Sequence, residues 1–257
     1  MTKRIITGAI GGIGFLSLLY LGGTAYGVLL FFIVFLGFYE WLRMNSIHIW
    51  DISSIIGFIF TIYYFLPTRF YGGPTIEAVL LEVLLLLLVP VMTKNKSSIH
   101  EVAYILLGSL YLGTSFHLMM ETRLLTEGFA ITLTILIAVW TTDSAAYFVG
   151  KAIGKHKLWP AISPNKTIEG SLGGIVFAIV FVAVVNLFVG GATFFHAILI
   201  ALTVAISGQL GDLVESAVKR ALDVKDSGRI LPGHGGILDR FDSLIFVFPV
   251  LYLFTLI

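Results

Sequence analysis

The chain has 257 residues, of which 58% are hydrophobic and only 12% are charged, against roughly 25% charged residues in an average soluble domain. With a mean hydropathy of +0.98 it has too little polar surface to cover a water-soluble core, so a soluble globule is excluded. The absence of cysteine excludes a disulfide framework, thiolate-bound metal and a cysteine nucleophile. The net charge of +1 gives no sign of a nucleic-acid partner, and none is expected.

Nine apolar runs follow one another along the chain, and most approach the roughly 17–25 residues that a helix needs to cross a bilayer. The first run resembles a signal peptide because Lys3 and Arg4 precede it, but no clean cleavage site follows and a second apolar run begins at once. The sequence therefore predicts an all-α, polytopic integral membrane protein with about nine transmembrane helices, or a first pair that forms a hairpin without crossing fully. The runs cover residues 5–22, 25–42, 52–66, 76–92, 99–120, 128–150, 171–189, 193–215 and 243–257.

The basic residues orient these helices. With nine spans, every Lys and Arg except Arg69 and Arg123 falls on the face that carries the N-terminus. Basic residues near span ends resist translocation, which places this face in the cytoplasm and the C-terminus outside. The functional site is therefore expected to face the cytoplasm. We also expect the chain to be an integral protein of the plasma (inner) membrane of a prokaryote.

Polar residues are unevenly distributed between the two halves of the sequence. Residues 1–127 are almost uniformly apolar and are predicted to form a transmembrane scaffold of about five helices. Residues 128–257 are predicted to form a catalytic transmembrane domain of about four helices, with cytoplasmic loops 151–170 and 216–242. Three isolated acids of the scaffold are expected to pair or to reach the membrane interface: Glu40, Glu82 and Glu101.

Three acids in the second half lie inside apolar runs, where a charged side chain costs about 2.5–3.5 kcal/mol on insertion scales. Asp143 lies in the sixth run, and Asp212 and Glu215 lie at the end of the eighth. Asp212, Glu215, Ser216 and Lys219 are spaced i, i+3, i+4 and i+7, which places them on one helical stripe. A functional site is favoured there. The alternative is an amphipathic helix end whose i,i+4 pairs only increase its solubility.

The connection 225–242 combines several glycines with Pro, His, two Arg and three Asp. Glycine lets backbone N–H groups approach an anion, and Lys and Arg neutralise phosphate charge. Hard carboxylate oxygens suit Mg²⁺. This combination indicates phosphoryl or nucleotidyl transfer, in which positioning and charge neutralisation dominate catalysis.

Several of these residues also have a simpler interpretation. Asp239 and Asp242 could cap the last helix. Lys166 lies in a Ser-Pro turn before the seventh run, but it could also reach a nucleotide. His234 is either a polar loop residue or a phosphate contact, and without a second His at ligand spacing zinc is not expected.

Segment 216–242 resembles the signature of the phosphatidate cytidylyltransferases, also called CDP-diacylglycerol synthases. Trp140-x-x-Asp143, Ser163-Pro164-x-Lys166-Thr167-x-Glu169-Gly170 and Gly211-Asp212-x-x-Glu215-Ser216 are also similar to motifs of this family. Every specified position of the signature is matched, including Ser216, Lys219, Arg220, Lys225, Asp226, Gly228, Leu231, Pro232, His234, Gly235, Gly236, Asp239, Arg240 and Asp242.

The resemblance implies that CTP and phosphatidate react to give CDP-diacylglycerol and pyrophosphate. It also implies that Asp212 and Asp239 bind Mg²⁺, with a second cation such as K⁺, and that Lys219 and Arg220 act with them in catalysis. A homodimer is compatible with a small enzyme of this kind. The residues expected to bind the substrates or line their pocket are Asp143, Lys166, Glu215, Ser216, Lys225, Asp226, His234, Gly235, Gly236, Arg240 and Asp242.

Two rival interpretations stay open at this point. A cation-coupled transporter would explain the intramembrane acids, but it gives no reason for the loop 225–242. Another CTP-using membrane lipid enzyme is the second alternative.

Overall fold

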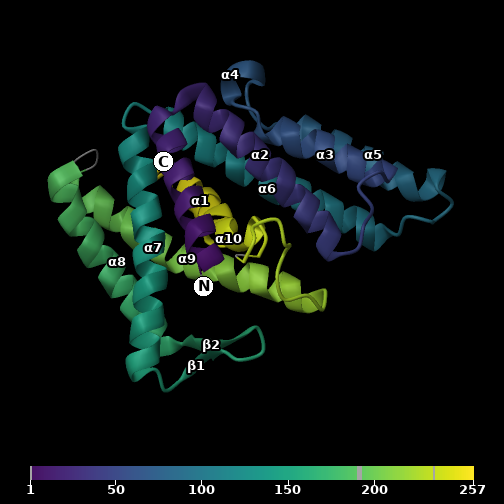
Figure 1. Ribbon diagram of the computed structural model, residues 1–257. Helices are drawn as coiled ribbons and strands as arrows, with labels where there is room; N and C mark the ends of the chain where they lie inside the picture. The colour runs from purple at the N-terminus through teal and green to yellow at the C-terminus, as the bar shows by residue number, and fades with distance from the viewer. Residues whose placement is uncertain (1, 190–192, 234) are drawn as a thin grey trace. The chain divides into compact units, whose positions relative to one another are not determined.

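The computed structural model describes residues 2–189, 193–233 and 235–257, for residues 2–7 and 189 the backbone alone, and this part of the chain is mainly helical (Figure 1). Two short strands interrupt the helices between α7 and α8. The elements are α1 (Thr2–Leu21), α2 (Gly23–Met44), α3 (Ile52–Phe65), α4 (Thr68–Tyr71), α5 (Ile76–Met92), α6 (Ile99–Leu124), α7 (Gly128–Ile153), β1 (Lys157–Trp159), β2 (Ser163–Thr167), α8 (Ile168–Val189), α9 (Phe194–Ala221) and α10 (Leu238–Leu253).

A helix corresponds to each of the nine apolar runs, although α10 ends at Leu253, before the end of the run 243–257, and α4 is an additional single turn. Among the described residues, five helices are long and apolar enough to cross a membrane, namely α2, α6, α7, α8 and α9. The helical membrane-protein character is therefore confirmed. The number of nine spans and the orientation of the termini stay predictions.

The helices extend beyond the apolar runs on the side of the predicted loops. Helix α9 continues through the polar residues 216–221, and α10 begins at Leu238, so the connection between them is residues 222–237. Glu, Lys and Arg are good helix formers, and their i,i+4 pairs support a helix outside the hydrocarbon region. Hydropathy alone locates the end of the apolar stretch and not the end of the helix.

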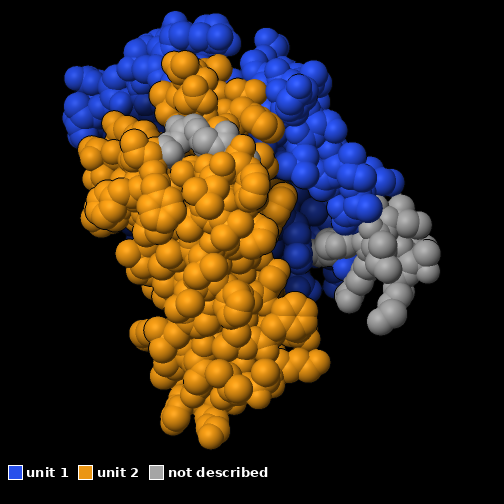
Figure 2. Space-filling view, turned by 90° about the vertical axis from the view of Figure 1, so that its left-hand side faces the viewer, with its two compact units in different colours: residues 1–121, 226–240 blue, residues 122–225, 241–257 orange. Residues whose placement is uncertain are grey.

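The chain divides into two compact units, which are described separately (Figure 2). Unit 1 consists of Met1–Glu121 and Asp226–Arg240, and unit 2 consists of Thr122–Lys225 and Phe241–Ile257. Segment 226–240, which contains the glycines of the predicted loop 216–242, thus belongs to the same unit as the N-terminal helices. This division shows which residues pack compactly together and does not show which unit is catalytic. The predicted boundary between a scaffold and a catalytic domain near residue 127 therefore stays a prediction.

Unit 1 is held together by aromatic and polar contacts between α2, α3, α5 and α6. The indole of Trp41 on α2 stacks on the ring of Tyr104 on α6, with centroids 4.8 Å apart. Trp41 Nε1 donates to the Tyr104 carbonyl at 3.1 Å, and the Tyr104 hydroxyl donates to the Trp41 carbonyl at 2.8 Å. A Cβ on Gly108 would collide with the same indole, so glycine allows the close approach of the two helices.

A fully buried acid, Glu82 on α5, joins three helices of unit 1. It accepts hydrogen bonds from the Tyr64 hydroxyl on α3 at 2.8 Å and from the Ser109 hydroxyl on α6 at 2.5 Å. The expectation that Glu82 pairs is therefore confirmed. Its partners are helical side chains in an apolar interior, where a polar group must be satisfied internally.

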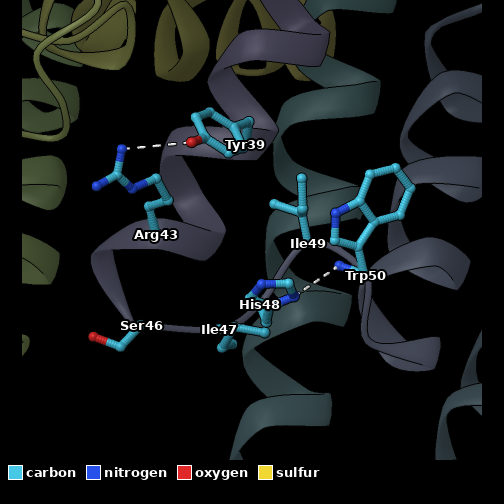
Figure 3. A pocket seen from close by; sticks show the side chains of 7 residues that line it. All are labelled: Tyr39, Arg43, Ser46, Ile47, His48, Ile49 and Trp50. Carbon is cyan, nitrogen blue, oxygen red and sulfur yellow. Dashed lines mark hydrogen bonds between the residues drawn. The ribbon is translucent and has the colours of Figure 1, made fainter.

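A surface pocket of about 360 Å³ lies where α2 leads into α3 (Figure 3). Arg43 lines it and donates to the Tyr39 hydroxyl at 3.4 Å, while its guanidinium lies over the Tyr39 ring. No predicted site residue lines this pocket, which is formed by Tyr39, Arg43, Ser46, Ile47, His48, Ile49 and Trp50.

Unit 2 is built on α7, α8 and α9, and close contact between α7 and α8 depends on small residues. A Cβ on Gly170 would lie 2.6 Å from the Ala146 carbonyl oxygen and 3.1 Å from the Cα of Gly150. A Cβ on Gly174 would lie 2.9 Å from the carbonyl oxygen of Thr142. These positions let the backbones of α7 and α8 approach each other.

An antiparallel hairpin, β1 with β2, connects α7 to α8 within the predicted loop 151–170. Lys157 pairs with Thr167, and Trp159 pairs with Ser163. Glu169, in the first turn of α8, accepts from the His156 backbone N–H at 3.2 Å and forms a hydrogen bond with its imidazole Nδ1 at 2.6 Å. The hairpin is thereby fixed to α8, and strand β2 holds Lys166 in a defined place.

Candidate functional site

Asp212 on α9 is the centre of the polar residues in unit 2. Its Oδ2 lies 2.7 Å from the Lys166 ammonium on β2, and its Oδ1 accepts from the Ser216 hydroxyl at 3.3 Å. The side chains of Asp212 and Lys166 are 34% and 25% exposed, respectively. Three predicted site residues are thus in contact, and the carboxylate stays accessible to a ligand.

Two further acids of unit 2 face this pair. The Asp143 carboxylate on α7 interacts electrostatically with Asp212, Asp242 and Lys166. The Asp242 carboxylate on α10 interacts with Asp212 as well, and its Oδ1 accepts from the Ser243 backbone N–H at 2.8 Å. Carboxylates from three helices therefore share one region. Their mutual repulsion favours a cation or a positively charged side chain among them.

The approach of α10 to α9 depends on Gly211, the residue before Asp212. A Cβ at this position would lie 2.7 Å from the Asp242 carbonyl oxygen and 2.7 Å from the Cβ of Phe246. Glycine therefore allows the helix turn that carries Asp242 to lie directly against the helix turn that carries Asp212.

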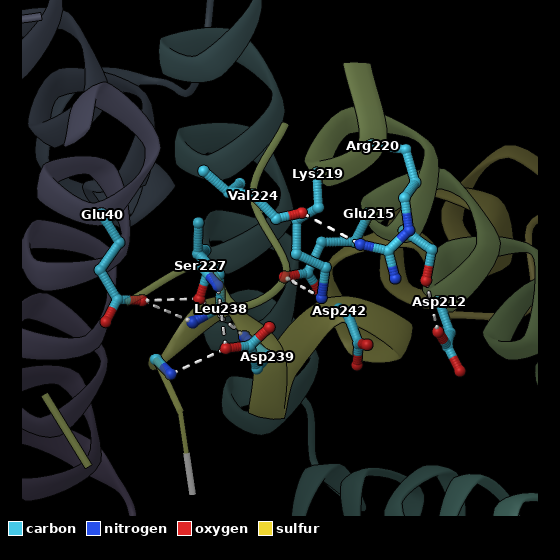
Figure 4. Close-up of polar contacts among 12 residues, drawn as sticks. Glu40, Asp212, Glu215, Lys219, Arg220, Val224, Ser227, Leu238, Asp239 and Asp242 are labelled. Atoms are coloured by element: carbon cyan, nitrogen blue, oxygen red, sulfur yellow. Dashed lines mark hydrogen bonds and ion pairs between the residues drawn. The ribbon is translucent and has the colours of Figure 1, made fainter. Parts of the chain in front are cut away.

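Glu215 and Lys219 form an i,i+4 ion pair one turn further along α9, with Lys219 Nζ 3.2 Å from Glu215 Oε1 (Figure 4). Both residues are buried, at 8% and 9% exposure. This burial contradicts the alternative of a solvated helix end. Arg220 points to the exposed side and donates to the Val224 carbonyl at 3.1 Å, where it satisfies a backbone acceptor beyond the C-terminus of α9.

Asp239, in the first turn of α10, organises the loop in unit 1. Its Oδ2 accepts from the backbone N–H of Ser227 at 3.0 Å and of Gly236 at 2.8 Å, and its own N–H donates to the Ser227 hydroxyl at 3.3 Å. Gly235 has φ +83°, and a Cβ there would lie 2.6 Å from Asp239 Oδ2. Asp239 therefore binds loop backbone groups that precede α10, a structural role that is compatible with metal binding through its other oxygen.

Glu40 on α2 was expected to pair or to reach the membrane interface, and the structure shows that it pairs, with residues of the segment that contains Asp239. It is 1% exposed, and its Oε2 accepts from the Ser227 hydroxyl at 3.1 Å and from the Leu238 backbone N–H at 3.0 Å. Glu40 could have been selected from the sequence by the criterion that selected Asp143, because both are acids within an apolar run. Its partners lie 187 and 198 residues away in the sequence, beyond any local pattern.

The remaining predicted residues are only partly placed by the structure. Lys225, Asp226 and Arg240 are exposed. His234 lies outside the described residues. Asp212 belongs to unit 2 and Asp239 to unit 1, so their binding of one ion stays a prediction; within the described part of the chain, no group of three Asp, Glu or His side chains is arranged around a common metal position.

Comparisons with known proteins identify the class of this chain. Residues 2–257 match the Cytidylyltransferase family, and the chain belongs to that family of nucleotidyltransferases. The phosphatidate cytidylyltransferase of Bacillus subtilis (strain 168) is 44% identical over 259 residues, covering 98% of this chain and 96% of the relative. Those of Staphylococcus saprophyticus and Staphylococcus aureus (strain COL) are 40% and 42% identical, each covering 98% of this chain and 97% of the relative.

Proposed function

We propose that this chain transfers the cytidylyl group of CTP to phosphatidate, producing CDP-diacylglycerol and pyrophosphate. The observation that carries the proposal is the identity of 40–44% to phosphatidate cytidylyltransferases over nearly the whole chain. The contacts among Lys166, Asp212 and Ser216, and between Asp239 and its loop, support it because they involve residues of the signature and of the upstream motifs that are similar to those of this family.

In the proposed reaction a phosphate oxygen of phosphatidate attacks the α-phosphorus of CTP directly. A new P–O bond forms between this oxygen and the α-phosphorus. The bond from the α-phosphorus to the oxygen that bridges it to the β-phosphorus breaks, and pyrophosphate leaves with the electron pair of that bond. A phosphate monoester has its second pKa near ~6 and is largely ionised at neutral pH, so no strong base is needed. The main obstacle is repulsion between two polyanions, which basic side chains reduce.

The basic residues are proposed to reduce this repulsion from different positions in the structure. Lys166 lies beside Asp212 in a partly exposed position, from which it can contact a phosphate of a bound nucleotide. Lys219 is buried against Glu215 and contributes positive charge to the site from below the surface. Arg220, Lys225 and Arg240 are exposed and are proposed to bind the phosphates of CTP and the leaving pyrophosphate.

The donors present fit a hard divalent cation. Asp212 and Asp239 would hold Mg²⁺, and the nearby carboxylates of Asp143 and Asp242 add negative charge that favours a cation. When bound, Mg²⁺ would offset the charge of the substrate phosphates. A second cation such as K⁺ belongs to the same proposal.

An apolar groove on the surface of unit 2 is compatible with a lipid substrate. It has a volume of about 410 Å³ and lies along α7 and α8, and Trp140 and Ser144 at its wall flank Asp143 in the sequence. We propose that the site opens to the cytoplasm, where CTP is found, while phosphatidate arrives laterally from the inner membrane of a bacterium. A homodimer is compatible with this proposal, which does not depend on one.

The test is incubation of the purified protein in detergent with labelled CTP, phosphatidate and Mg²⁺, followed by chromatography. A labelled liponucleotide that depends on phosphatidate is expected. No liponucleotide from a folded preparation would contradict the proposal, and saturable solute flux in proteoliposomes without CTP consumption would favour a transporter instead.

A further inference from the structure

Glu40 is a buried acid whose hydrogen-bond partners, Ser227 and Leu238, lie in segment 226–240, which also contains Asp239 (Figure 4). Burying a carboxylate is costly unless hydrogen bonds compensate for the lost water. The carboxylate of Glu40, 1% exposed, receives two such bonds at its Oε2, from the Ser227 hydroxyl and the Leu238 backbone N–H. Helix α2 is thereby joined to segment 226–240 at two places, Ser227 near its start and Leu238, the first residue of α10.

The two residues that Glu40 binds are both connected to Asp239. Ser227 donates its hydroxyl to Glu40, accepts the Asp239 N–H at its Oγ, and donates its own N–H to Asp239 Oδ2 at 3.0 Å. Leu238, the other partner of Glu40, is the residue directly before Asp239. The position of the Asp239 carboxylate is therefore set through two residues that Glu40 holds.

Two glycines of the loop leave room for this acid. A Cβ on Gly228 would collide with the Glu40 carboxylate, and a Cβ on Gly236 would collide with both that carboxylate and the Ser227 hydroxyl. Neither glycine has a positive φ, whereas Gly233 and Gly235 do. Gly228 and Gly236 are needed for space and not for backbone conformation. The expectation that loop glycines also serve an anion stays a prediction.

Glu82 provides a comparison within the same unit. It is equally buried, but its partners are Tyr64 and Ser109 on neighbouring helices and not residues of the loop. Burial alone therefore does not distinguish Glu40 from Glu82. Glu40 differs because it contacts segment 226–240.

From these contacts we infer that Glu40 is a positioning residue, which fixes the loop 226–240 and the orientation of the Asp239 carboxylate. The inference rests on the proposed function for its kinetic consequence. Its structural part, that Glu40 holds the loop, stands on the contacts of unit 1 alone.

The kinetic test uses the liponucleotide assay. Glu40→Ala should lower kcat by roughly 10–100-fold, the effect expected when a group that orients a ligand residue is removed. Glu40→Gln retains an oxygen that can accept both hydrogen bonds and should recover most of the lost kcat. Glu82→Ala, the matched buried-acid control, should reduce thermal stability while the folded protein keeps a kcat near that of the wild type.

A double-mutant cycle tests the contact with Gly228. Gly228→Ala should lower kcat because the new Cβ meets the Glu40 carboxylate, and in the Glu40→Ala background the same change should have little further effect. Multiplicative losses in the double variant, or a wild-type kcat for Glu40→Ala, would overturn the inference.

Hydrogen exchange followed by mass spectrometry tests the structural part without substrates. In Glu40→Ala the amides of 226–240 should exchange at least tenfold faster, while peptides of α5 remain unchanged; Ser227→Ala serves as a second variant if Glu40→Ala does not fold. Unchanged exchange in the loop would overturn the inference. Failure of the wild type to use CTP and phosphatidate would instead contradict the proposed function and leave this readout intact.

Discussion

Replacement of Asp212 by Asn separates the chemical role of this carboxylate from its structural role. The ion pair with Lys166 is partly exposed on both sides, at 34% and 25%. Pairs of this kind contribute about 0–1 kcal/mol to stability after screening by solvent. Asn can still accept from Ser216, so the free energy of unfolding should change by no more than about 1 kcal/mol.

Turnover should respond very differently. The substitution removes one negative charge and one hard oxygen from the predicted metal site, and loss of one electrostatic contribution at a reacting centre costs roughly 10²–10³ in kcat. The measurement is the initial rate of liponucleotide formation at saturating CTP and phosphatidate, combined with thermal unfolding followed by tryptophan fluorescence.

The matched control is Asp223→Asn. Asp223 is exposed beyond the end of α9 and has φ +55°, a conformation that Asn also tolerates. It should keep both rate and stability. A near-normal rate for Asp212→Asn would refute the chemical role, and a large loss of stability would refute the reasoning about the ion pair.

Four further predictions follow from the same contacts. Asp239→Ala should abolish turnover and also cost about 1–3 kcal/mol of stability, because it removes the carboxylate oxygen that accepts two loop N–H groups, and an unchanged free energy of unfolding in chemical denaturation would contradict this. Lys219→Met should destabilise by about 3–5 kcal/mol, since it leaves Glu215 buried without its ion-pair partner, and the double variant with Glu215→Gln should recover part of that loss. Gly211→Ala should cost about 1–3 kcal/mol through its collision with the Asp242 carbonyl, and unchanged unfolding would contradict the close contact of α9 and α10. Chelation of divalent ions by EDTA should abolish turnover, and added Mg²⁺ should restore it; activity that survives chelation would contradict the metal assignment.

The helices were largely predictable because lipid imposes a strong pattern on the sequence. Every apolar run corresponds to a helix, and for α5 the bounds coincide with the predicted ones. The errors lie where that pattern ends. Helix α9 continues for six residues past its apolar run, and the strands β1 and β2 have only three and five residues, too few for a clear alternation.

The candidate site was predictable where its residues share one helix. The stripe of Asp212, Glu215, Ser216 and Lys219 gives the contacts that helical spacing predicts. The ion pair of Asp212 with Lys166 and the contact of Glu40 with Ser227 connect distant segments, and a single sequence holds no local signal for such pairs. The space that Gly228 and Gly236 provide likewise becomes evident only once Glu40 is placed beside them.

The proposed chemistry depends on one divalent ion held by both Asp212 and Asp239. Electron paramagnetic resonance of Mn²⁺, which shares the preference of Mg²⁺ for hard oxygen ligands, measures this binding directly. The wild-type protein should bind Mn²⁺ tightly, and Asp212→Asn and Asp239→Asn should each remove this binding. Wild-type affinity and stoichiometry in either variant would contradict a shared ion.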